Sequence, residues 1–279
     1  MPLPTEFQFS QASLQDFVTC ARRFKLRYLD ELRWPAVETE PVAEAERLAR
    51  LGTDFHRLVH QHLVGLDVDT LTATLALAEP DLKSWWHNYL AYRPPELTGA
   101  RLYPELSLST PLRGYRLLAR FDVLAVASTG ALYIIDWKTA HHRPGREALA
   151  RRLQSRVYPF VLATAGAAFN GGRPVDPAAI KMIYWYPQFP DQPEIFEYDD
   201  KQQARDEQFL SELIQRVTDA AERAEFPLVE DRTPCTYCVY RSLCDRGVQA
   251  GPLAANTEDT TEEFDELALD WDQIAEIQF

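Results

Sequence analysis

The chain has 279 residues, 46% of them hydrophobic, which is enough to bury one substantial core with a small additional lobe. No apolar run is long enough to span a bilayer, and the first residues carry neither the basic nor the apolar segment of a signal peptide. Composition therefore gives no reason to expect a membrane protein, and a cytoplasmic protein is the expectation.

The formal net charge of −13 argues at first against a nucleic-acid partner. The acidic residues are unevenly distributed, however: residues 250–279 contain nine of them and no Lys or Arg, so the rest of the chain carries −4. That part also has two basic groups, which are Arg22, Arg23, Lys25 and Arg27, and His141, His142, Arg143, Arg146, Arg151 and Arg152. The charge therefore does not exclude DNA or RNA.

The N-terminal third is predicted to be helical. Ser10 is a suitable N-cap for a helix that runs to about Leu32 and contains Cys20. A second helix is predicted over residues 42–64 and a third over residues 71–92, with an aromatic stripe that we expect in the core. His56 and His60 lie one turn apart on the second helix, but no Glu follows His56 directly, so the zinc-protease arrangement is excluded.

Strands and helices alternate in the next hundred residues. We predict strands over residues 101–109, 115–127, 132–137, 180–186 and 194–198, and helices over 146–169 and 201–225. Glu105 lies in the first strand, and Pro159 is expected to kink the first of these helices. Gln154 and Tyr158 share a face of that helix. The order predicts an α/β core with a mixed sheet.

The third of these strands ends in Asp136-Trp137-Lys138. Side chains alternate along a strand, so Asp136 and Lys138 are expected on one face and Trp137 on the other. If residues 128–130 close a hairpin, Asp122 lies beside Asp136. Two carboxylates and a lysine can bind a divalent metal next to a positive charge, which suits the hydrolysis of a phosphodiester. A surface ion pair at an edge strand is the alternative.

Three of the four cysteines lie within ten residues, at Cys235, Cys238 and Cys244, and Cys20 lies far upstream. In a cytosolic chain, four thiols suit a metal or an iron–sulfur cluster better than disulfides. Zinc usually binds two close pairs, so one distant cysteine with a trio favours a [4Fe-4S] cluster over zinc. The alternative is that Cys20 is an ordinary buried thiol.

Several motifs together resemble the PD-(D/E)XK nuclease superfamily. Asp122 and Asp136-Trp137-Lys138 resemble its core, with Phe121 at the position of the proline. Gly52-x3-His56 and Gln154-x3-Tyr158 resemble motifs of the RecB-like branch. The segment around Cys20, together with the three later cysteines, resembles the iron–sulfur staple of AddB-type and CRISPR-associated exonucleases. The resemblance extends from about Ser10 to Asp245, with all motifs in order.

This resemblance implies a restriction-endonuclease-like core with an iron–sulfur-stapled helical lobe, and a role for each motif residue. His56, Asp122, Asp136 and the carbonyl of Trp137 would bind Mg²⁺ or Mn²⁺, and Lys138 would orient water or stabilise the transition state. Gln154 and Tyr158 would support the site and contact the nucleic-acid backbone, with Glu105 as an additional carboxylate. The implied cluster ligands are Cys20, Cys235, Cys238 and Cys244. Independently of the resemblance, Arg22 and Arg23 either belong to a solvated face of the first helix or contact phosphate.

The expected activity is that of a metal-dependent DNA exonuclease or endonuclease acting on single-stranded or end-bearing DNA, in repair and recombination or in CRISPR adaptation. A non-catalytic DNA-binding or assembly subunit and a zinc-stabilised regulatory protein are the alternatives. We expect one domain over residues 1–249, made of a helical part (10–95), the sheet core (100–200) and a helix with the cysteine cluster (201–249). The acidic tail (250–279) either stays flexible, docks on a protein partner or covers the nucleic-acid groove.

Overall fold

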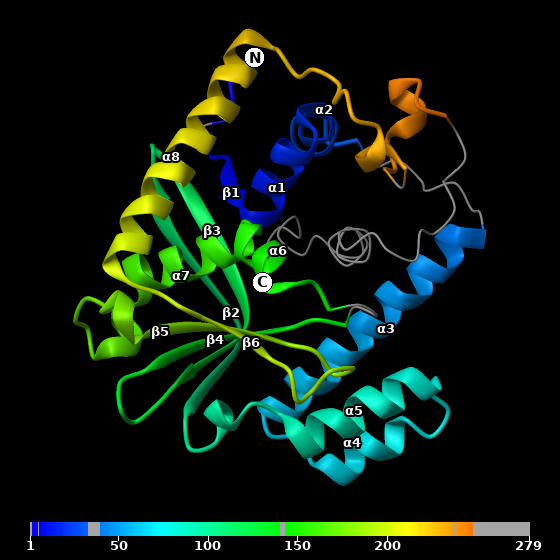
Figure 1. Ribbon diagram of the computed structural model, residues 1–279, viewed down its shortest axis with the longest axis vertical. Helices are drawn as coiled ribbons and strands as arrows, with labels where there is room; N and C mark the ends of the chain where they lie inside the picture. The colour runs from blue at the N-terminus through cyan, green and yellow to red at the C-terminus, as the bar shows by residue number, and fades with distance from the viewer. Residues whose placement is uncertain (1, 5, 33–39, 140–142, 237, 248–279) are drawn as a thin grey trace, which may run out of the picture.

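The computed structural model describes residues 2–4, 6–32, 40–139, 143–236 and 238–247. It shows an α/β fold in which one mixed sheet of six strands has helices on both faces (Figure 1). The strands are β1 (Gln8–Ser10), β2 (Arg101–Leu112), β3 (Tyr115–Val126), β4 (Leu132–Trp137), β5 (Ile180–Trp185) and β6 (Glu194–Glu197). The five strands predicted from the sequence are confirmed, and the short β1 was missed. Within the described residues, no helix is both long enough and apolar enough to cross a membrane.

Two separate hydrophobic cores form because alternate side chains of the buried strands face opposite sides of the sheet. Ile134 and Met182 belong to the first core, beneath α7 (Gln154–Ala165) and α8 (Asp200–Arg223). Ile135 and Ile183, each one residue further on, belong to the second core. That core is covered by α3 (Glu40–Leu63), α4 (Val68–Thr74) and α5 (Pro80–Tyr92).

The N-terminal helix is shorter than predicted. Ser10 caps it as expected, because its hydroxyl accepts a hydrogen bond from the Ser13 amide at 3.1 Å. The helix that it begins, α1, covers only Gln11–Thr19. Cys20 is extended (φ −161°, ψ 111°), and it is followed by α2 (Ala21–Phe24) and a π-helical turn (Lys25–Leu29). The prediction that Cys20 lies inside a continuous helix was therefore wrong.

Two further predicted helices are each divided in two. The segment predicted over residues 71–92 forms α4 and α5, and Pro80 begins α5 because proline fits the first turn of a helix. The segment predicted over residues 146–169 breaks between α6 (Arg146–Arg151) and α7, where Arg152 is extended. The break does not occur at Pro159, since α7 continues through that residue.

The pairing of β3 leaves an opening in the sheet. Along one side, β3 pairs with β2 from Tyr115 to Val126, except at Asp122, where neither Asp122 nor Glu105 of β2 forms a register pair. Along the other side, residues 116–118 pair with β1 in parallel, and residues 123–126 pair with β4 in antiparallel. Residues 119–122 therefore lie between the end of one partner and the start of the other, and Asp122 is the last residue of this open edge.

Candidate active site

The hairpin between β3 and β4 brings Asp122 and Asp136 together, as expected from the sequence. The pairing of Val123 with Ile135 is the last of the ladder, and Asp122 and Asp136 follow it on the two strands. The Trp137 amide donates a hydrogen bond of 2.7 Å to Asp122 Oδ2. The side chain of Trp137 packs in the second core, on the face opposite Ile134.

Asp136 is buried and held by two partners. Its Oδ1 accepts a 2.5 Å hydrogen bond from Gln154 Nε2, at the start of α7, and its Oδ2 lies 3.1 Å from Lys138 Nζ. The expected shared face of Asp136 and Lys138 is therefore confirmed by their ion pair. Lys138 also lies over the Tyr184 ring, with its Nζ 5.8 Å from the centroid.

His56 of α3 and Glu105 of β2 also lie close to Asp122. His56 Nδ1, on α3, is 3.5 Å from Asp122 Oδ1, so His56 is the histidine of the predicted pair that reaches the carboxylates. Ligand atoms of His56, Glu105 and Asp122 all lie within 4.8 Å of one another. Asp136 is not part of this group. Among the described residues, His56, Glu105 and Asp122 therefore form a candidate metal position, and the part of Asp136 in metal binding stays a prediction.

The backbone of Glu105 is unusual. It is left-handed (φ 53°) in the middle of β2, where the register places it opposite Asp122. The regular alternation of side chains between the two faces of the sheet is interrupted in β3 at this point. Phe121 packs in the first core and Val123 in the second, although regular alternation would put them on one face. The change of face therefore falls at Asp122, directly before the pair of Val123 with Ile135.

Burial and neighbouring charges act differently on the two aspartates. Burial favours the neutral acid at both positions, but at Asp122 the charge and hydrogen bond of His56 and the Trp137 amide outweigh it and lower the pKa. At Asp136, burial together with the charge of Asp122 outweighs Lys138 and raises the pKa to about 6. The pKa of Lys138 is raised because the attraction of Asp136 overcomes the effect of burial. The site thus holds one ionised acid, one acid that titrates near neutrality, and a charged lysine.

Two residues predicted to contact nucleic acid lie inside the protein. Tyr158 is buried, with its ring 5.2 Å from that of Phe121, and burial raises its pKa well above the usual value. Arg23 is buried as well, and its Nε lies 2.7 Å from Asp16 Oδ1. A phosphate contact by Arg23 would require it to leave this ion pair. Arg22 is partly exposed, and its role stays a prediction.

Sequence reasoning missed Arg120. Its guanidinium binds Glu105, with Nη2 2.8 Å and Nε 3.0 Å from Glu105 Oε2. The signal was present, because Arg120 precedes Asp122 by two residues in a strand that was predicted. Which partner it would find depends on the neighbouring strand, and the register was unknown.

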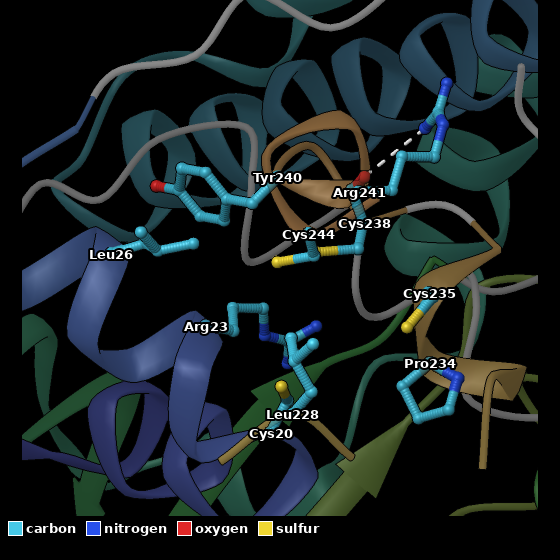
Figure 2. A pocket seen from close by; sticks show the side chains of 10 residues that line it. All are labelled: Cys20, Arg23, Leu26, Leu228, Pro234, Cys235, Cys238, Tyr240, Arg241 and Cys244. Carbon is cyan, nitrogen blue, oxygen red and sulfur yellow. Dashed lines mark hydrogen bonds between the residues drawn. The ribbon is translucent and has the colours of Figure 1, made fainter. Parts of the chain in front are cut away.

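The four cysteines converge at one place, as Figure 2 shows. They line a pocket together with Arg23, Leu26, Leu228, Pro234, Tyr240 and Arg241. Among the residues that the structure describes, no three of the four sulfurs lie within 4.8 Å of one another. A tetrahedral zinc would place all of them about 3.8 Å apart, given zinc–sulfur bonds of about 2.3 Å. The arrangement is wider than a zinc site.

The residues present fit the metals that the resemblance implied. Carboxylates and one histidine suit a divalent cation such as Mg²⁺ or Mn²⁺. Four thiols at wide spacing suit a larger cluster. Burial raises the pKa values of Cys235 and Cys244, so these thiols would release protons when they bind iron.

Comparison with known proteins assigns the family. The model of the PD-(D/E)XK nuclease superfamily matches residues 8–245, and the chain belongs to this superfamily. The crystal structure of a "Putative exonuclease" from Eubacterium rectale is similar at 11% identity and a TM-score of 0.51, covering 90% of this chain and 91% of that one. The structure of SSO0001 covers 87% of each chain at 14% identity, with a TM-score of 0.41. No curated protein matches the chain.

Proposed function

We propose that this protein is a metal-dependent DNA nuclease of the RecB-like branch, an exonuclease that acts on single-stranded or end-bearing DNA. The observation that carries the proposal is the meeting of His56, Asp122, Asp136 and Lys138 at the open edge of β3. A scaffold that only binds DNA has no need to hold a buried acid beside a second acid and a lysine that are both partly buried, because burying charges is costly. Repair, recombination and CRISPR adaptation stay the predicted settings, in the cytoplasm.

A divalent cation bound here would polarise the scissile phosphate and lower the pKa of a water molecule. The side chains around the cation would supply the ligands, the positive charge and the hydrogen bonds that the reaction needs. Asp122 is ionised and offers Oδ1 beside His56, while its Oδ2 is held by the Trp137 amide. Lys138 keeps its proton and can donate to the attacking water or to a phosphoryl oxygen that gains negative charge. Gln154 fixes the orientation of Asp136.

The cation has two possible ligand sets that share His56 and Asp122. The expected set adds Asp136 and the Trp137 carbonyl, and the second adds Glu105. In this structure Asp136 is engaged by Gln154 and Lys138, and Glu105 by Arg120. The closer grouping of Glu105 with His56 and Asp122 supports its inclusion as a ligand.

We further propose that the cysteine pocket holds a [4Fe-4S] cluster. One distant cysteine with a trio supports a cluster over zinc, because zinc usually binds two close pairs. Its position between the N-terminal helices and residues 235–244 supports a structural role, in which the cluster connects the two ends of one domain over residues 1–249. The acidic tail (250–279) lies outside the described residues, and its predicted roles stay predictions.

The decisive experiment compares wild type with Asp136→Ala and Lys138→Ala on labelled single-stranded DNA, in Mn²⁺ and in EDTA. Cleavage by wild type in Mn²⁺ alone, abolished by both substitutions while DNA binding remains, is the expected result. Equal cleavage by all three proteins would reveal a contaminating nuclease. Binding without cleavage by wild type would favour the non-catalytic DNA-binding subunit.

A further inference from the structure

One part of the sheet presents a polar face. From Leu117 to Phe121, every second side chain of β3 packs in the first core. The side chains that alternate with these therefore project from the opposite face of the sheet. They are Arg116, Leu118 and Arg120, and none of the three is fully buried.

The strands on both sides of β3 extend this face. Residues that are paired in register lie on the same face of a sheet. The pairs of β3 with β1 and β2 therefore define a polar face of eight residues, which are Gln8 and Ser10 of β1, Ser107, Ser109 and Pro111 of β2, and Arg116, Leu118 and Arg120 of β3. None of them is acidic, and Gln8, Ser107 and Arg116 are exposed.

The polar face lies outside both hydrophobic cores. Beyond Asp122, the same side of the sheet is apolar, because Val123 and Ala125 pack in the second core beneath α3, α4 and α5. None of the eight residues of the polar face belongs to either core or packs against it. In Figure 1, α4 and α5 lie far below β1, at the other end of the sheet.

The polar face carries more positive than negative charge. The Arg116 guanidinium binds the Ser109 hydroxyl, and among the described residues it pairs with no carboxylate. Arg120 is bound to Glu105, the acid next to the face. Of the two guanidinium groups, only that of Arg120 thus has an acidic partner within the described chain, and that of Arg116 can attract an anion from the solvent.

The polar face ends at the candidate metal position. Arg120 binds Glu105 Oε2 through Nη2 at 2.8 Å and Nε at 3.0 Å. Glu105 is in turn grouped with His56 and Asp122. Arg116 precedes Asp122 by six residues, which is about 20 Å along β3. A chain of phosphates that contacts Arg116 can therefore pass over Arg120 and reach the metal position.

We propose that the polar face binds the phosphate backbone of a single nucleic-acid strand beside the metal position, with Arg116 as its principal phosphate contact. This inference rests on the proposed nuclease function and adds to it the surface along which the substrate lies. Phosphate oxygens are bound mainly by Arg and Lys, together with polar side chains such as Ser and Gln, which are the residue types of this face. A phosphate bound by the guanidinium also releases counterions, which makes the contact visible in the salt dependence of binding.

Binding of a fluorescent single-stranded DNA oligonucleotide, measured in EDTA over a series of salt concentrations, tests this assignment. We expect Arg116→Gln to weaken binding roughly tenfold at low salt and to reduce the slope of log K against log[salt] by about 0.7. Arg116→Lys should restore most of the slope because it keeps the charge. Arg101→Gln is the control and should leave the slope near that of wild type. Arg101 is exposed on β2, but it is paired with Val126, which packs against the first core, so it projects from the other face.

A charge added to the polar face should have the opposite effect. We expect Ser107→Lys, opposite Arg120, to tighten binding about three- to tenfold at low salt and to steepen the slope by about 0.7. Ser128→Lys adds the same charge in the turn between β3 and β4, outside the polar face, and should leave the slope near that of wild type. Equal changes in the two lysine variants, or none in Ser107→Lys, would overturn the polar face as the binding surface.

Cleavage in Mn²⁺ separates this proposal from the nuclease function. If wild type cleaves DNA while Arg116→Gln and Ser107→Lys keep its salt dependence, the polar face is wrong and the nuclease function stands. If wild type neither binds nor cleaves the oligonucleotide, both are wrong. If wild type binds without cleaving and only the variants of the polar face change the slope, the polar face stands and the protein is the non-catalytic DNA-binding subunit.

Discussion

Glu105 combines a strained backbone with a position beside two candidate metal ligands. A left-handed conformation costs a non-glycine residue on the order of 1–2 kcal/mol, and its persistence at functional sites has a recognised mechanistic use. Here it lies beside the change of face at Asp122, between Phe121 in the first core and Val123 in the second. The strained backbone is therefore part of the conformation that places Glu105 beside His56 and Asp122.

Removal of the Glu105 charge should weaken metal binding. We expect Glu105→Gln to lower the affinity for Mn²⁺ roughly tenfold or more, because one oxygen ligand loses its charge. Calorimetric titration with Mn²⁺ measures this directly. Glu197→Gln is the control, since the Glu197 side chain is 78% exposed and pairs with Lys181 on the next strand. An unchanged affinity in Glu105→Gln would restrict the ligand set to the residues predicted from the sequence.

The raised pKa of Asp136 predicts how metal binding depends on pH. Because Asp136 holds its proton up to about pH 6 in the folded protein, affinity for Mn²⁺ should fall as the pH decreases through 6. The same shift costs stability: ionising a buried acid whose folded pKa exceeds its unfolded value destabilises the metal-free fold as the pH rises from about 4 to 6. A bound cation would offset that cost.

Titration of Mn²⁺ affinity between pH 5 and pH 8 checks this expectation, with Asp136→Asn as the comparison. The variant should bind more weakly at every pH and show a flatter profile, because it has lost the group that titrates near 6. A wild-type profile that is flat from pH 5 upward would contradict the assigned pKa of Asp136.

Much of the site could be predicted at the residue scale, and the exceptions have a common cause. Alternation along one strand was enough to pair Asp136 with Lys138, and a short turn was enough to bring Asp122 beside them. The contact of Arg120 with Glu105 and the position of Glu105 beside His56 and Asp122 depend on the β2–β3 register and on a left-handed residue. Neither leaves a local pattern in the sequence.

At the scale of elements, helix breaks interrupt two segments that were predicted as single helices. The extended residue between α1 and α2 is Cys20, and the one between α6 and α7 is Arg152. The apolar residues keep a helical spacing across both breaks, and this spacing predicted a single helix in each segment. No glycine or proline marks either break, and tertiary contacts evidently decide the local conformation.

The first of these breaks is supported by a buried ion pair. Asp16, 2% exposed, lies 2.7 Å from Arg23 and 3.2 Å from Arg27, so it fixes α2 and the π-helical turn against α1. We expect Asp16→Asn to lower the free energy of unfolding by roughly 3 kcal/mol, because a buried Arg23 loses its counter-charge. Urea titration measures the change.

Asp30→Asn is the matched control for this prediction, since Asp30 and its partner Lys25 are each about one-third exposed and such pairs contribute less than about 1 kcal/mol. Arg23 also lines the cysteine pocket, so Asp16→Asn should reduce the iron content of the purified protein. Equal stability of the two variants would show that the Asp16 pair adds nothing beyond a surface contact.

At the scale of the whole molecule, the cysteine pocket joins two segments that are far apart in sequence. Cys20 follows α1, which packs beside β1, and the three other thiols come after α8 (Figure 1). Tyr240 strengthens this junction, because its hydroxyl donates a 2.8 Å hydrogen bond to the Leu32 carbonyl. The N-terminal segment also joins the sheet, because β1 pairs with residues 116–118 of β3, just before the open edge that ends at Asp122.

A cluster in this pocket would close nearly the whole chain into one loop, and its loss should cost stability accordingly. By analogy with a cross-link that closes a loop of 100 residues or more, we expect Cys20→Ser to lower the free energy of unfolding by roughly 4 kcal/mol. The variant should also lose the visible absorbance of an iron–sulfur cluster. Val18→Ala, at an exposed position of α1, should change neither property. A Cys20→Ser protein with full absorbance and unchanged stability would mean that the C-terminal thiols bind their metal without the N-terminal helices.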